Sequence, residues 1–405
     1  MKSSLDLKGK IFLPGGFAFA AVRAGIKASG RLDLATVQMC PGTTAAAVFT
    51  KNRVTAAPLQ VAKASLKTAK GQVRALVVNS GNANCATGDA GLKACQRVCK
   101  EAARIAEAKT EEIFPSSTGM IGVPFPVDKV VAKLPELIGQ ASTTEQGVRQ
   151  FAEAILTTDT RIKLASTILP SRKGDVTLLG VAKGSGMIHP QLATMLVYVF
   201  TDLVAAPRQL SRILRDACGD TFNCMSVDGD TSTNDTVLLL ASGQSGVRLK
   251  SLGVAKAFTN ALREVCQSLA EQIVSDGEGV KHVIRLFVEQ AKNRKQALKV
   301  ARAVAHSALV KTAWAGGDPN WGRILAAAGY SGAAINPKRV NIFIGDQQVC
   351  KAGQAHAFDG AEAHYYLSQP QCEVRVQLGQ GRVQIRFLTT DLTSEYVHIN
   401  ADYST

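Results

Sequence analysis

Short apolar runs alternate with longer amphipathic stretches along the 405 residues of the chain. The run Ala-Leu-Val-Val at 75–78 is typical of a buried strand, and it leads into a predicted polar turn, Asn-Ser-Gly-Asn, at 79–82. Apolar residues then recur at helical spacing from about Asp89 to Lys109, which predicts a helix with one buried face. This mixture of elements predicts an α/β protein (α/β or α+β) built in layers.

Three further helices are predicted in the first two thirds of the chain. One covers about 146–156, a second begins at Pro207, and a third covers about 254–273. Proline is favoured in the first helical turn because its φ is already helical and its missing N–H is not needed there. Each stretch places its apolar residues on one side, so each helix is expected to cover a sheet.

The pattern of predicted strands and helices changes after the turn Asp-Gly-Glu-Gly at 276–279. We therefore place a boundary near residue 280, with a layered domain at 1–280 and a smaller α/β domain at 281–405. The elements predicted in the second part are a strand at 283–288, a helix at about 295–310, a strand at 340–344, and a hairpin-like pair at 373–377 and 382–387 joined by a turn at 378–381.

The composition is that of a globular enzyme, with 46% hydrophobic and 20% charged residues. The net charge of +15 could serve nucleic acid, an anionic surface or an acidic small molecule. The sequence holds no dense Lys/Arg run and only 5% aromatic residues, so nucleic-acid binding is not expected. A solvated basic surface that also attracts small anions is the favoured interpretation.

The nine cysteines are odd in number and include no Cys-x-x-Cys pair, so we expect neither a disulfide framework nor a cysteine metal site. Such usage is typical of a reducing cytosol. The first residues do not form a secretory signal, and no apolar run is long enough to cross a bilayer. The sequence therefore predicts a cytoplasmic protein with no membrane partner.

The segment 183–196 holds the candidate chemistry: a glycine-rich first part leads into an apolar strand that starts at Met195. Thr194 lies at the junction. A threonine hydroxyl needs a neighbouring base to act as a nucleophile, and the most economical base is its own α-amine, freed by cleavage between Ala193 and Thr194. An α-amine titrates near pKa ~8. From these residues alone, a plain strand start is the commoner explanation.

Several blocks of sequence carry a resemblance to one family. The segments 184–190 and 193–196 resemble the self-processing ornithine acetyltransferases, also called glutamate N-acetyltransferases, of arginine biosynthesis. Further blocks look like that family in the same order, at 79–84, 117–119, 157–160, 228–235, 321–323 and 400–405. The resemblance covers essentially the whole chain, because the blocks run from one end to the other.

The resemblance implies an αββα-type sandwich of N-terminal-nucleophile character, with a C-terminal tail that returns to the active site. It implies cleavage into an α chain, 1–193, and a β chain starting at Thr194, assembled as an α2β2 heterotetramer. The implied reaction moves acetyl from N2-acetyl-L-ornithine to L-glutamate through acetyl-Thr194, in a ping-pong cycle. No cofactor is expected. Acetyl-CoA is a possible further donor for N-acetylglutamate synthesis.

The resemblance also assigns the site residues. Thr118 and Gly119 form the oxyanion hole beside the nucleophile Thr194, and the substrate-binding residues are Thr157, Lys183, Thr194, Glu278, Asn400 and Thr405. From the residues alone, 115–119 is a small-residue loop that could be an ordinary turn. A cation at Lys183 could hold a carboxylate or polarise an acyl oxygen, and an acid at Glu278 could bind an amino group. Thr405 could act only if the tail folds back.

Two further segments bear on the predicted site. The oxygen-rich segment 228–235 lacks calcium-hand spacing, so we interpret it as a structural turn lining the site and expect no metal. Arg161-Ile162-Lys163 departs from the usual family pattern, which leaves the acceptor preference open. The alternatives are a self-processing aminopeptidase or amidase of the same fold, in which water is the acceptor, and an uncut binding protein without enzymatic activity.

Overall fold

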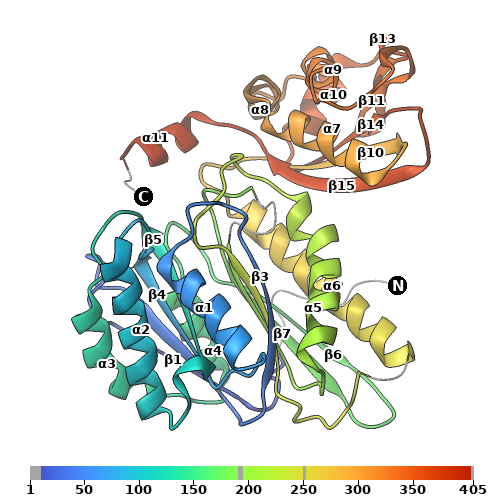
Figure 1. The fold of residues 1–405 in the computed structure, drawn as a ribbon. Helices are drawn as coiled ribbons and strands as arrows, with labels where there is room; N and C mark the ends of the chain where they lie inside the picture. Colours follow the sequence, from blue (N-terminus) through green and yellow to red (C-terminus); the bar gives the residue numbers. More distant parts are fainter. Residues whose placement is uncertain (1–10, 190–194, 250–251, 403–405) are drawn as a thin grey trace.

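The computed structural model describes residues 11–189, 195–249 and 252–402. The described part of the first 280 residues contains two β-sheets packed face to face (Figure 1). The first sheet has the order β1 (Phe17–Val22), β2 (Leu34–Met39), β4 (Ala75–Asn82), β5 (Ile113–Met120). The second has the order β3 (Thr44–Phe49), β9 (Thr236–Ala241), β8 (Leu196–Thr201), β7 (Val176–Lys183), β6 (Lys163–Leu169).

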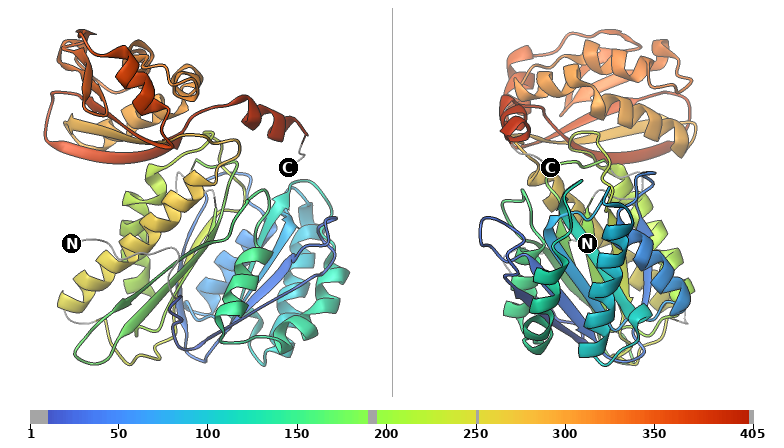
Figure 2. Two further views of the ribbon diagram at one scale, coloured as in Figure 1. Left: turned by 180° about the vertical axis from the view of Figure 1, so that it is seen from behind. Right: turned by 60° about the vertical axis from the view of Figure 1, so that its left-hand side comes forward.

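Helices cover the outer face of each sheet, so the layers follow the order αββα (Figure 2). The first sheet is covered by α1 (Ala57–Thr68), α2 (Gly88–Ile105) and α3 (Val127–Gly139), and the second by α5 (Pro207–Asp220) and α6 (Leu252–Ser275). The helix α4 (Glu145–Ala154) packs against β1 and contributes to the core between the sheets. The predicted fold class and the four predicted helices of this part are confirmed.

Aromatic side chains fill much of the core between the two sheets. Phe19 of β1 meets Phe200 of β8 edge to face, with ring centroids 5.1 Å apart, and Phe151 of α4 packs on both. Such pairs contribute about 0.5–1.5 kcal/mol beyond the area they bury. The buried Tyr198 of β8 donates its hydroxyl proton to Ser116 of β5 over 2.8 Å, which joins the sheets close to the cavity described below.

The residues after 282 form a third sheet with its own apolar core. Its order is β13 (Gln354–Ala355), β12 (Gln347–Lys351), β11 (Asn341–Ile344), β14 (Gln371–Gln377), β10 (Val283–Ala291), β15 (Val383–Thr390). Its helices are α7 (Arg294–His306), α8 (Ala308–Ala315), α9 (Trp321–Gly329) and α10 (Gly360–Leu367). The last helix, α11 (Ser394–Asp402), leaves this unit and runs back over the sandwich (Figure 1).

The described residues also form short 3₁₀ helices, and one of the predicted helices is interrupted. The 3₁₀ helices are Thr110–Glu112, Phe222–Cys224 and Pro337–Arg339. The helix predicted at 295–310 is divided into α7 and α8, because Ser307 takes an extended conformation and its side chain accepts the amide of Val310 as an N-cap. Among the helices of the described residues, none combines the length and apolarity that crossing a membrane requires.

The predicted hairpin of 373–377 and 382–387 is wrong, because β10 lies between β14 and β15 and pairs with both. The connecting segment bends around the end of β10 instead: Leu378 donates its amide to Glu289, and Gln380 and Gly381 donate theirs to Gln290. A short connection between two apolar strands is compatible with a hairpin and also with a third strand lying between the two. The sequence predicted β10 as a strand at 283–288 but did not reveal that it lies between the other two.

The predicted turn at 79–82 and the predicted loop at 115–119 are also wrong, because both segments are the ends of parallel strands. β4 and β5 stay paired through Gly81 and Gly119. Polar residues remain in these buried strand ends because their side chains bond one another: the hydroxyl of Ser117 lies 2.5 Å from Oδ1 of Asn79.

Candidate active site

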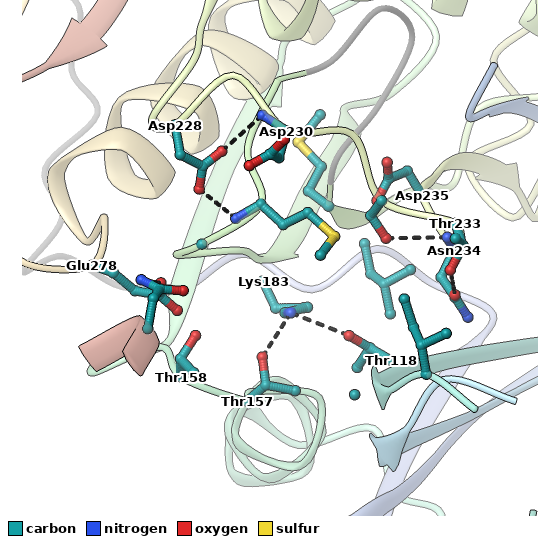
Figure 3. A pocket seen from close by; sticks show the side chains of 18 of the residues that line it. Thr118, Thr157, Thr158, Lys183, Asp228, Asp230, Thr233, Asn234, Asp235 and Glu278 are labelled. Carbon is teal, nitrogen blue, oxygen red and sulfur yellow. Dashed lines mark hydrogen bonds between the residues drawn. The ribbon is translucent and has the colours of Figure 1, made fainter. Parts of the chain in front are cut away.

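A cavity of about 370 Å³ opens where β5, β7 and β8 meet, beneath α11. Figure 3 shows Lys183 near its centre, with Glu278 on one side and Asn234 on the other. The cavity is lined by Thr118, Gly119, Ile121, Thr157, Thr158, Lys183, Gly186, Met187, Met195, Leu196, Asp228, Asp230, Ser232, Thr233, Asn234, Asp235, Glu278, Tyr396 and Asn400. These residues are far apart in the sequence, so the layered fold is what assembles the site.

Lys183 is the last residue of β7, and its side chain is buried. Its ammonium donates to the hydroxyl of Thr157 over 2.8 Å and to that of Thr118 over 3.2 Å (Figure 3). Because both hydroxyl oxygens accept from a cation, the proton of each hydroxyl is available to an acceptor in the cavity. Burial lowers the pKa of Lys183 from its usual value, and the nearby carboxylate of Asp159 opposes this shift.

A buried network of charged side chains lies next to Lys183. Oδ2 of Asp159 lies 4.0 Å from the Lys183 ammonium, and Oδ1 lies 2.7 Å from the ammonium of Lys163. Lys163, fully buried, also contacts Asp276 over 2.6 Å. Burial alone would raise the pKa of Asp159, but Lys183 and Lys163 outweigh it and hold that pKa at about 2.

Asp159 also fixes the backbone on both sides of the cavity. It accepts the amides of Thr157 over 3.0 Å and of Gly184 over 2.6 Å. Sequence reasoning included Asp159 in a family block but gave a role neither to it nor to Lys163 and Asp276. No local pattern signals this network, because the three charged residues lie in polar segments and their burial arises from contacts between distant parts of the chain.

Gly119 has to be a glycine for two reasons. Its φ is +130°, and a Cβ placed on it would lie 2.3 Å from the carbonyl carbon of Gly81 on the neighbouring strand. A side chain there would push β4 and β5 apart. The glycine therefore lets the backbone at Thr118 and Gly119 lie at the cavity wall, where N–H groups can serve as donors.

Glu278 lies in the turn between α6 and β10 and is buried. The side chain of Asn400, from α11, donates to Oε2 of Glu278 over 2.9 Å. Gly186 passes directly beside this carboxylate, because a Cβ on Gly186 would lie 2.3 Å from its Oε2. The structure thus brings together an acid and an amide that are 122 residues apart in the sequence.

The segment 228–235 forms an irregular loop along the cavity. Asp228 accepts the amides of Met187 over 2.6 Å and of Ile188 over 2.8 Å, and so holds the bend in which Met187 has a φ of +57°. Burial raises the pKa of Asp228 to about 6. In the described parts of the chain, no cluster of three or more His, Cys, Asp or Glu side chains is arranged to hold a metal ion.

Six of the residues assigned by the resemblance line this one cavity: Thr118, Gly119, Thr157, Lys183, Glu278 and Asn400. Ala193, Thr194 and Thr405 lie outside the described residues. Met195 lines the cavity and follows Thr194 in the chain. Tyr396 also lines it, and sequence reasoning missed this residue because its helix has little apolar periodicity. The roles of all these residues remain predictions.

Fold and site together define a layered αββα protein with a polar cavity of the kind that suits acyl transfer to a small polar substrate. Comparison with known protein families is more specific: the model of the ArgJ family matches residues 18–405. The chain therefore belongs to the ArgJ family.

Individual relatives agree with this membership. The arginine biosynthesis bifunctional protein ArgJ of Methylococcus capsulatus is 42% identical over 394 residues, which cover 96% of this chain and 95% of that protein. A crystal structure of the same-named protein from Bacillus halodurans, with a TM-score of 0.50, is 40% identical and covers 52% of this chain and all of that one. An ornithine acetyltransferase from Mycobacterium tuberculosis, solved with ornithine, is 39% identical over 44% of this chain and 94% of that one, with a TM-score of 0.42.

Proposed function

We propose that this protein is an acetyltransferase of arginine biosynthesis that moves acetyl from N2-acetyl-L-ornithine to L-glutamate. The observation that carries the proposal is the cavity in which the Lys183 ammonium bonds the hydroxyls of Thr118 and Thr157, in a chain of the ArgJ family. Its volume of about 370 Å³ lies at the lower end of the range for small-molecule sites, which suits an acylated amino acid.

The proposed nucleophile is Thr194, made N-terminal by self-cleavage. Its hydroxyl oxygen attacks the carbonyl carbon of Ala193, the peptide C–N bond breaks, and water then hydrolyses the resulting ester. This leaves a carboxylate on Ala193 and an α-amine on Thr194 that can take the hydroxyl proton. Met195, the next residue, lines the cavity and fixes the start of β8 by accepting the amide of Thr236 over 3.0 Å.

Acetyl transfer then takes two half-reactions. The Thr194 oxygen attacks the acetyl carbonyl of acetylornithine, the amide bond breaks, and ornithine leaves after its nitrogen gains a proton. The amine of glutamate attacks the acetyl-Thr194 ester, the ester C–O bond breaks, and the hydroxyl is restored. Each step passes through an oxyanion, which the hydroxyl of Thr118 and the backbone N–H of Gly119 would stabilise.

The charged residues of the cavity complement amino-acid substrates. The Lys183 ammonium is placed to bind a substrate carboxylate, with Thr157 beside it. Glu278, held by Asn400, is placed to bind a cationic amino group. Thr405 is proposed to complete this side of the site from the end of the chain. The 228–235 loop needs no metal for any of these steps.

Cleavage would give fragments of 193 and 212 residues, and the second is 52% of the 405-residue chain. The Bacillus halodurans chain, in its full length, likewise covers 52% of this chain. We further propose an α2β2 assembly without a resident cofactor, with acetyl-CoA as an alternative donor for N-acetylglutamate synthesis. A cytoplasmic location would keep the nine free cysteines reduced.

The first prediction concerns the nucleophile. Wild-type protein should show two masses, for residues 1–193 and 194–405, when its intact mass is measured. Thr194→Ala should give a single mass and lose several orders of magnitude in transfer rate, because the attacking oxygen is gone. Thr177→Ala, a substitution in β7, is a matched control that should be cleaved normally. A Thr194→Ala protein that still divides at this bond would refute the mechanism.

Glutamate dependence separates the transferase from a hydrolase of the same fold. Purified protein is incubated with acetylornithine, with and without glutamate, and released ornithine is measured. A transferase releases stoichiometric ornithine and then stops unless glutamate is present. Continuous release without glutamate would instead assign an amidase.

A further inference from the structure

A second cavity, of about 850 Å³, adjoins the acyl-transfer cavity and shares Thr157 with it. Its walls come from the connection between β1 and β2, from α4, from the ends of β4 and β5, and from the segment 157–162. The charged residues lining it are four cations, Lys27, Arg31, Arg149 and Arg161, and two acids, Glu153 and Asp159. Among the described residues, none that was assigned a catalytic or substrate-binding role lines it apart from the shared Thr157.

Three of these six charges, Arg149, Asp159 and Arg161, have ion-pair partners, and the two cations Lys27 and Arg31 outnumber the one acid, Glu153, that has none among the described residues. Arg149 pairs with Glu145 over 2.7 Å, and Asp159 is committed to Lys163. In the described part of the chain, neither Lys27 nor Arg31 forms an ion pair with an acid. The cavity therefore carries an excess of positive charge.

Lys27 is held in place by its surroundings. The fully buried carboxylate of Asp33 accepts the amides of Ala24, Ile26 and Lys27 over 2.6, 2.6 and 3.0 Å, which fixes the backbone of this connection. Gly81 provides room for the side chain, since a Cβ on Gly81 would lie 3.0 Å from Cγ of Lys27. The same Gly81 backs directly onto Gly119, so Lys27 lies behind the proposed oxyanion hole.

The ammonium of Lys27 has a donor to spare. It donates to the carbonyl of Leu32 over 2.9 Å and to that of Ala154 over 3.4 Å, which uses two of its three N–H groups. Burial lowers its pKa to about 8; the carboxylate of Asp33 opposes this shift, and the positive charges of Lys183 and Arg31 add to it. A bound anion would relieve this repulsion and accept from the remaining N–H group.

We propose that the cavity around Lys27 and Arg31 is an anion subsite of the acyl-transfer site, which takes the carboxylate or phosphate end of a substrate. Arg161, whose guanidinium lies 3.8 Å from the carboxylate of Asp276, adds to the positive charge of this cavity. This gives a role to the segment Arg161-Ile162-Lys163. The inference rests on the proposed function for the identity of the substrates, but not for the binding of the anion itself.

The test measures anion binding directly. Intact, purified protein is titrated with inorganic pyrophosphate by calorimetry, at constant ionic strength set with chloride. Wild type should bind, and Lys27→Gln should raise the dissociation constant by about tenfold, the effect of losing one charge-assisted hydrogen bond. Lys27→Arg should restore much of the affinity. Lys338→Gln, an exposed cation of the C-terminal unit, should behave as wild type.

Equal affinity in wild type and Lys27→Gln, or no binding by wild type, would overturn the subsite. Kinetics then identify the source of the anion: a higher KM for glutamate in Lys27→Gln points to the carboxylate of the acceptor, and a higher KM for acetyl-CoA points to the phosphates of a donor. A KM unchanged for both also overturns the inference. Wild type that binds pyrophosphate but transfers no acetyl would refute the proposed function alone.

Discussion

At the scale of single residues, the cavity depends on charges that are buried but paired. Lys163 is fully buried between Asp159 and Asp276, and Asp159 extends this network to Lys183. Removing one member of a buried ion pair typically costs about 3–5 kcal/mol because its partner stays uncompensated. The network therefore orders the segments that carry Thr157 and Glu278, and it sets the protonation of Lys183.

Asp159→Asn should change the pH dependence of catalysis. The asparagine keeps the shape but removes the charge that raises the pKa of Lys183 against the effect of burial. Because the proposed role of Lys183 needs its ammonium, the alkaline limb of kcat/KM should move to lower pH. At neutral pH, kcat/KM should fall about 10- to 100-fold, the value of a lost charge-assisted bond of about 1.5–3 kcal/mol.

A pH–rate profile for acetyl transfer checks this expectation. Asp128→Asn, at an exposed position paired with Arg97, is the matched control and should leave the profile unchanged. A uniform loss of activity at every pH, with the alkaline limb in its wild-type position, would show that Asp159 has only a structural role.

At the scale of elements, α11 closes one side of the cavity. The hydroxyl of Thr393 donates to the carbonyl of Gly279 over 2.6 Å, and Tyr396 packs so closely that a Cβ on Gly279 would lie 2.4 Å from its amide nitrogen. Asn400 then reaches Glu278 from the last turn of the helix. The helix is thus fastened to the turn at 276–279, which explains how a terminal element contributes to a site in the sandwich.

Asn400→Asp should weaken substrate binding. The substitution replaces a donor to Glu278 with a second carboxylate at about the same place, so the two acids repel each other and α11 loosens. We expect KM for acetylornithine to rise about 10- to 100-fold, as for a lost hydrogen bond to a charged group. The thermal midpoint should change little because Asn400 is exposed apart from this contact.

Steady-state kinetics and thermal unfolding measure the two effects separately. His398→Ala, on the exposed side of the same helix, should match wild type in both. If Asn400→Asp retains the wild-type KM, the contact between Asn400 and Glu278 does not hold the binding site together.

At the scale of the molecule, the C-terminal unit is joined to the loop that lines the cavity. The buried ammonium of Lys311, on α8, donates to the carbonyls of Val227 and Thr390 over 2.7 and 2.6 Å. Ser226 donates its amide to Leu388 of β15 over 2.9 Å. The third sheet therefore supports the 226–235 segment, and through Asp228 the bend at Met187 and Ile188 that precedes the proposed cleavage point.

Sequence reasoning predicted the elements whose local pattern decides their structure. The amphipathic spacing located α2, α4, α5 and α6 to within a few residues. It failed at the ends of β4 and β5, where buried polar residues satisfy one another across strands, and at β14 and β15, where the partner strand comes from elsewhere in the chain. The cavity was located by resemblance, whereas the network around Lys163 depends on long-range contacts that no local pattern encodes.

The junction between the two units also predicts how stability depends on pH. His306, the last residue of α7, meets His189 edge to face with ring centroids 4.2 Å apart, and its Nε2 lies 3.0 Å from the hydroxyl of Ser226. Burial is the main cause that lowers the pKa of His189 to about 4 and that of His306 to about 3. Both rings are thus held neutral in the folded protein.

Because the unfolded histidines titrate near ~6.5, the unfolded chain binds more protons below that pH. The stability that comes from keeping the rings neutral is complete above about pH 6.5 and is lost as the pH falls toward the pKa values of the folded protein.

Lowering the pH from 7 to 5 should therefore reduce the thermal midpoint by a few degrees, since about 1 kcal/mol corresponds to ~2–4 °C in a domain of 150–250 residues. His306→Phe, which keeps a ring but cannot gain a proton, should show a smaller reduction. His356→Asn, which follows β13 at the opposite edge of the third sheet from β15, should follow wild type. Equal losses in His306→Phe and wild type would place the acid sensitivity elsewhere, since a phenylalanine has no proton to gain.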